Sequence, residues 1–64
     1  MKKLKVGEEY CKEFLNSYGY SIQLDLFDRK RFGITNQKTG DVVAYAKESG
    51  GGFYRISEVK KDED

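Results

Sequence analysis

The chain has 64 residues with 12 basic and 11 acidic side chains, one cysteine, and neither histidine nor proline. A chain of this length makes one small domain, and a single cysteine without histidine excludes an internal disulfide and the usual zinc ligand sets. No run of about eighteen apolar residues occurs, so the sequence offers no candidate for a membrane-spanning helix. The unpaired cysteine and the lack of an export signal favour a reducing, cytoplasmic compartment.

The first predicted element is a helix from about Val6–Gly7 to Tyr18–Gly19. Apolar side chains recur there at intervals of three and four, as on the buried side of an amphipathic helix. Glu8 and Glu9 would lie in the first turn, where carboxylates complement the helix dipole. Gly19 would end the helix in the left-handed conformation. The predicted buried stripe consists of Tyr10 or Cys11, Phe14, Leu15 and Tyr18.

From Tyr20 onward the spacing changes to strict alternation, which predicts half-buried antiparallel strands. Four strands are expected, at residues 20–27, 31–36, 41–47 and 52–60, joined by turns at 28–30 and 37–40 and by a glycine-rich loop at 48–51. Gly40 is expected to adopt a positive φ in its turn. The sequence therefore predicts an α+β fold in which one N-terminal helix packs on a three- to four-stranded antiparallel β-meander.

One choice of strand pairing places apolar residues on a single face across all three predicted hairpins. In this register Ile34 lies opposite Val43 in the following strand and Leu24 in the preceding one. The face that the helix covers would then hold Ile22, Leu24, Leu26, Phe32, Ile34, Val43, Tyr45, Tyr54 and Ile56. Agreement among independent local pairings is typical of a real sheet.

The opposite face of the predicted sheet would be left open, because one helix covers only one side. It carries small and apolar residues, which either are ordinary scattered surface residues or mark an interaction site. We expect this face to bind another protein, or a second copy of the chain, with aromatic and arginine side chains in the contact. The predicted contact residues are Phe27, Arg31, Val42, Ala44, Phe53, Arg55 and Val59.

A second interpretation places single-stranded nucleic acid on the same face. Phe27 and Phe53 would stack on bases, while Arg31, Arg55 and Lys47 would contact phosphates. Residues 1–61, which hold all 12 basic and 8 of the 11 acidic side chains, carry a net charge of +4, too small to require such a partner. These residues are expected to form the domain, and residues 62–64 a disordered acidic tail.

Catalysis is not expected. Histidine, the usual base near neutral pH, is absent, and Cys11 lies on the predicted apolar stripe without a base beside it. The three glycines at 50–52 lack the lysine and hydroxyl residue of a phosphate-binding loop, and a strand follows them. We therefore predict an interaction module without catalytic activity, metal or cofactor, acting as an accessory regulator or inhibitor of the kind that phages also encode.

Overall fold

The computed structural model describes residues 3–60. They form β1 (Glu9–Cys11), α1 (Lys12–Ser17), β2 (Tyr20–Leu24), β3 (Phe32–Asn36), β4 (Val42–Gly50) and β5 (Phe53–Val59). The strands make one antiparallel sheet in the order β1-β5-β4-β3-β2. The predicted α+β class with an antiparallel sheet is confirmed, whereas the number of strands and the position of the helix differ from those expected. The predicted tail at 62–64 lies outside the described residues.

The helix begins at Lys12 because the residues before it pair with β5. The Gly7 amide donates to the Ile56 carbonyl at 2.8 Å, and the Ile56 amide donates to the Glu8 carbonyl at 2.8 Å. Tyr10 is therefore buried by the alternation of a short strand rather than by a helical stripe. At the other end, Gly19 has φ of +90° and closes the helix as predicted.

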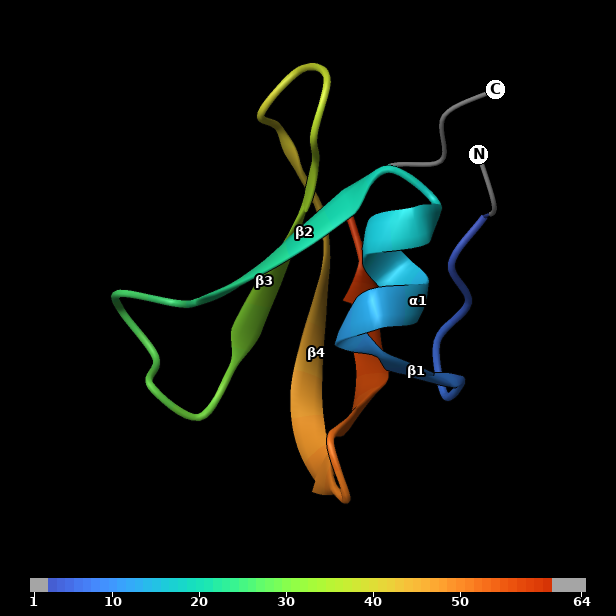
Figure 1. Cartoon of the computed structure of the whole chain (residues 1–64). Coiled ribbons are helices and arrows are strands. Elements are labelled where there is room, and N and C mark those ends of the chain that lie inside the picture. The colour runs from blue at the N-terminus through green and yellow to red at the C-terminus, as the bar shows by residue number, and fades with distance from the viewer. Residues whose placement is uncertain (1–2, 61–64) are drawn as a thin grey trace.

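The helix connects the two opposite edges of the sheet, since it follows β1 directly and leads into β2 after two residues. Figure 1 shows the strands curving around one side of the molecule, with α1 lying between β1 and the start of β2. Leu15 is the helix residue that enters the core and is fully buried. Phe14, which the helical spacing placed in the buried stripe, is 43% exposed.

The register of β4 differs from the predicted one by one residue over most of its length. Ile34 pairs with Ala44 and Phe32 with Ala46, and the pairing shifts at a bulge between Ile34 and Thr35. A shift of one residue exchanges the two faces of a strand. Ala44 and Ala46, expected on the open face, are therefore fully buried, and Tyr45, expected under the helix, faces the other way.

The pairing of β2 with β3 is shifted by two residues, which preserves the faces but moves the turn. Leu24 pairs with Phe32, and β2 ends there instead of continuing to residue 27. Leu26 and Phe27 consequently belong to the loop between β2 and β3. The expectation that Leu24 and Leu26 are covered by the helix is wrong, since they are 48% and 91% exposed.

The core is small and lies between the curved sheet, the helix and the N-terminal segment. Its buried members are Leu4, Tyr10, Leu15, Tyr20, Ile34, Ala44, Ala46 and Ile56. The Tyr10 hydroxyl donates a hydrogen bond to a Glu8 carboxylate oxygen, and burial together with this carboxylate raises the pKa of Tyr10 to about 12. Alanines at the centre of the sheet suit a concave surface, where little room remains between the strands and the helix.

Replacing Ala44 with leucine tests the observed register of β4. Because Ala44 is fully buried, the added atoms must be accommodated in a packed core, and we expect a loss of about 1–3 kcal/mol in the free energy of unfolding. Lys47→Leu, on the exposed side of the same strand, serves as the control and should change it by less than about 0.5 kcal/mol. Urea unfolding measures the free energy of unfolding of both variants. If Ala44→Leu lowers it as little as Lys47→Leu does, Ala44 is not in the core and the register predicted from the sequence is the correct one.

Candidate functional site

The loop at residues 25–31 has a defined conformation because its own side chains satisfy its backbone. One carboxylate oxygen of Asp25 accepts the amide of Phe27 at 2.8 Å and that of Asp28 at 3.4 Å. The Asp28 carboxylate in turn accepts the Lys30 amide at 3.0 Å. At the base of the loop, the Asp25 amide donates to the Arg31 carbonyl at 2.9 Å. Such aspartate turns replace the backbone pairing that the strands no longer provide.

An ion pair joins the two ends of this loop. The second carboxylate oxygen of Asp25 lies 2.8 Å from Nε and 2.6 Å from a terminal nitrogen of Arg31. The amide of Phe27, followed by the Arg31 guanidinium, lowers the pKa of Asp25 below its usual value. The same guanidinium lies 3.9 Å from the centre of the Tyr45 ring, a cation–π contact. Loop, β3 and β4 are thereby connected on the face away from the helix.

Two large apolar side chains stand out from this loop. Phe27 is 98% exposed and Leu26 is 91% exposed, while Leu24 at the end of β2 is 48% exposed. Beside them the outer face of the sheet forms a shallow pocket of about 270 Å³. The pocket is lined by Gln23, Leu24, Asp25, Leu26, Phe27, Arg31, Gly33, Thr35, Val42 and Tyr45. Its floor is low at Gly33, which has no side chain and faces Tyr45 in the neighbouring strand.

The structure brings together three of the predicted contact residues, because Phe27, Arg31 and Val42 all line this pocket. Ala44 is fully buried and points into the core, so its predicted exposure is wrong. Val59 pairs with Ala44 and packs partly buried against the same core, so it too lies on the helix side rather than the open one. Both residues lie on the opposite face from the predicted one because bulges in β4 and β5 shift the strand pairing.

Phe53 and Arg55 lie apart from the pocket, since β4 separates their strand from β3. Phe53 is 45% exposed and pairs with Cys11 of β1. Arg55 forms an ion pair with Glu9 at 2.8 Å. Cys11, expected to be buried on a helix, is instead a half-buried free thiol in β1. This second outer patch combines one aromatic ring with charges that already neutralise each other.

Sequence reasoning missed Tyr45, Leu24 and Leu26 as surface residues because it assigned all three to the core face. For Leu24 and Leu26 the sequence carries a signal, the two aspartates at 25 and 28, which favour a turn that begins earlier. For Tyr45 the only signal is the pair of alanines on either side of it, since small residues fit beneath a closely packed helix. The bulge that decides the face of Tyr45 has no sequence signature here.

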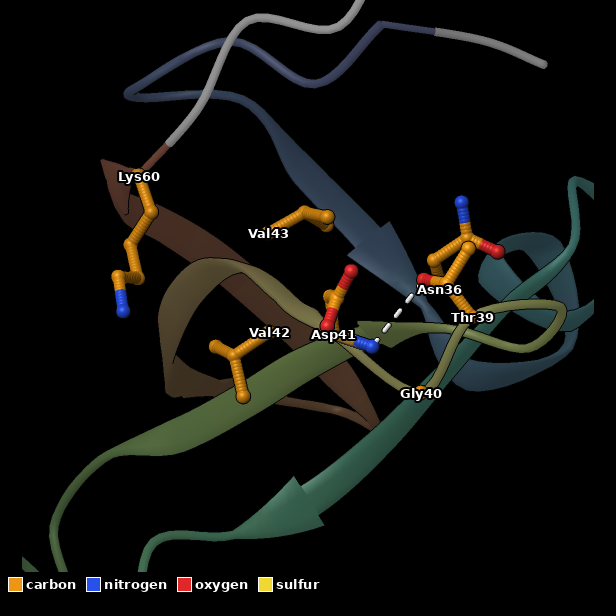
Figure 2. A pocket seen from close by; sticks show the side chains of 7 residues that line it. All are labelled: Asn36, Thr39, Gly40, Asp41, Val42, Val43 and Lys60. Atoms are coloured by element: carbon orange, nitrogen blue, oxygen red, sulfur yellow. Dashed lines mark hydrogen bonds between the residues drawn. The ribbon is translucent and has the colours of Figure 1, made fainter.

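A second hollow, of about 730 Å³, lies at the turn between β3 and β4. Figure 2 shows Lys60 at one end and the turn from Asn36 to Gly40 at the other, with Val42 and Val43 between them. The polar groups of the turn are engaged in holding it: the Asn36 carboxamide accepts the Lys38 amide at 2.8 Å, and the Gly40 amide donates to the Asn36 carbonyl at 2.7 Å. This hollow is therefore a feature of the turn rather than a set of convergent free groups.

Among residues 3–60 no cluster of three histidine, cysteine or acidic side chains is placed to hold a metal ion. Within the same residues, the helix falls far short of the length and apolar character needed to cross a membrane. Comparison with protein-family models, with curated proteins and with solved structures found no match. The pocket and its loop are thus interpreted from their own geometry.

Replacing Asp25 with asparagine tests the role of its charge in the loop. A lowered pKa means that the charged form stabilises the fold above the ordinary value of 3.8, and that this stabilisation is lost as the pH falls through the lowered pKa. We therefore expect Asp25→Asn to reduce the free energy of unfolding at pH 7 and to have a smaller effect at pH 3. Urea unfolding at both pH values measures the difference, and an equal effect at both would contradict the charge-based account.

Proposed function

We propose that the chain is a protein-binding module, and that the loop at residues 25–31 and the adjoining pocket make the contact. The observation that carries this proposal is the exposure of Leu26 and Phe27, at 91% and 98%, on a loop that internal hydrogen bonds hold in place. Adjacent apolar side chains in contact with water favour association, and an ordered loop loses little conformational entropy when it binds. A regulator or inhibitor of a partner protein acts through a surface of this type.

The pocket supports the same proposal. Its lining includes Tyr45, Val42 and Arg31, and its volume of about 270 Å³ suits one or two side chains of a partner. Aromatic and arginine residues are enriched at the centres of protein interfaces. Because the Arg31 charge is already paired with Asp25, an apolar side chain placed beside it would not isolate a bare cation.

Single-stranded nucleic acid is the second candidate, and one observation favours it. Arg29 and Lys30 are exposed beside Phe27 on the same loop, so an aromatic ring and two cations point to solvent within a short segment. Both arginines expected to contact phosphates, Arg31 and Arg55, are however paired with Asp25 and Glu9. A phosphate would have to displace these carboxylates, which ranks nucleic acid below protein as the partner.

The contact made by Phe27 is tested with peptides selected from a displayed random library against the immobilised chain. We expect Phe27→Ser to weaken the binding of the selected peptides by more than about tenfold. Because the Phe27 ring is almost fully exposed, the melting temperature of the Phe27→Ser variant should differ from that of the wild type by less than about 4 °C. Val6→Ser, which also alters an exposed apolar residue, should retain binding. Peptides that bind the wild-type chain and Phe27→Ser equally, or a library that yields none, would overturn the proposal.

The two candidates are separated by titrating a fluorescent oligothymidine at low and at physiological salt. We expect no binding at physiological salt, because the nearly balanced charge releases few counterions. Binding that persists there, falls steeply as salt rises further and is lost in Phe27→Ser would instead establish the nucleic-acid function.

A further inference from the structure

The outer edge of β2 exposes backbone groups whose direction the hydrogen bonds establish. The Asp25 amide donates to Arg31 and the Gly19 carbonyl accepts from Gln37, so both residues direct their backbone groups toward β3. Backbone groups alternate in direction along an antiparallel strand. Ile22 and Leu24 therefore direct their amides and carbonyls away from β3. No other strand of the described sheet lies beyond β2.

The two edges of the sheet are protected to different extents. Natural proteins blunt an edge strand by shortening it or by placing charge, proline or a bulge on it. β1 has three residues, begins with the charged Glu9 and leads directly into the helix. β2 has five residues without charge or proline, and its pairing with β3 continues without a bulge. Figure 1 shows α1 beside the start of β2, and the strand then runs away from the helix.

We propose that β2 pairs antiparallel with β2 of a second copy of this chain, about a two-fold axis through Gln23. In this register Ile22 of each copy exchanges both backbone hydrogen bonds with Leu24 of the other, so the only backbone groups used are those that point outward. The register also leaves the Tyr20 carbonyl with the Gln37 side chain, which donates to it at 3.0 Å.

The side chains of β2 are compatible with pairing to themselves. Ile22 and Leu24 would face each other across the axis on one face, covering part of a leucine that is 48% exposed in the single chain. On the other face the two Gln23 side chains would be direct neighbours, and an amide can both donate to and accept from its own copy. Electrostatic repulsion between two copies would be weak, because β2 carries no charged side chain and the net charge of the chain is only +1.

This pairing shares Gln23 and Leu24 with the lining of the pocket, but Phe27, Arg31 and Tyr45 take no part in the strand contact. It would extend the sheet across two chains and leave each with its own loop and pocket. A small domain with few fully buried side chains also gains stability from association.

The test introduces a positive or a negative charge at Gln23, an exposed position. The molecular mass in solution is measured by sedimentation equilibrium. The wild-type mass should rise with concentration from 7.4 kDa toward twice that value. Gln23→Lys and Gln23→Glu should each remain monomeric, because like charges would lie directly opposite across the axis. An equimolar mixture of the two variants should recover the dimer. Circular dichroism melting confirms that each variant is folded.

Ser57→Lys is the matched control, since it adds the same charge on β5, which β4 and β3 separate from β2. It should dimerise like the wild type. A wild-type chain that stays monomeric up to about 1 mM would overturn the pairing, since that concentration corresponds to a very weak dissociation constant. A dimer that Gln23→Lys leaves intact would place the contact elsewhere. A monomer that binds an extended peptide of another sequence along Ile22–Leu24 would assign the edge to a different occupant.

Discussion

The geometry of the exposed surface depends on one carboxylate, that of Asp25. One of its oxygens holds the backbone of the loop through the amides of Phe27 and Asp28, and the other holds Arg31. The Arg31 guanidinium then lies over the Tyr45 ring, and both residues line the pocket. Without this carboxylate, the amides of Phe27 and Asp28 and the Arg31 guanidinium would each need another partner, and the loop would keep only its Asp28 turn and its backbone hydrogen bonds.

The second constraint is the curvature of the sheet. A single helix of six residues can close the space between two sheet edges only if the strands bend around it, and the interior is then narrow. Ala44 and Ala46 fit this interior, whereas the larger Tyr45 between them is directed outward. The same bend that makes a small core possible therefore supplies the aromatic wall of the pocket.

The sequence predicted the antiparallel sheet, the turn glycines at 19 and 40 and the outward position of Phe27 from local spacing and turn chemistry. It did not predict β1, because the three residues of this strand lie within an apolar spacing that also suits a helix, and only pairing with β5 decides between them. The faces of Ala44, Tyr45 and Val59 followed from bulges, which depend on long-range pairing. Of the candidate site, the sequence predicted Phe27, Arg31 and Val42 as surface residues, but it missed Leu26, Tyr45 and the loop at residues 25–31 itself.

Backbone ¹⁵N relaxation of Leu26 and Phe27 measures whether the loop at residues 25–31 is held in one conformation. We expect order parameters for these two amides close to those of the strands, at about 0.8 or above, because the Asp25 carboxylate binds the Phe27 amide. Values below about 0.6, typical of a flexible segment, would contradict this expectation, since an apolar loop that moves freely would present no defined surface to a partner.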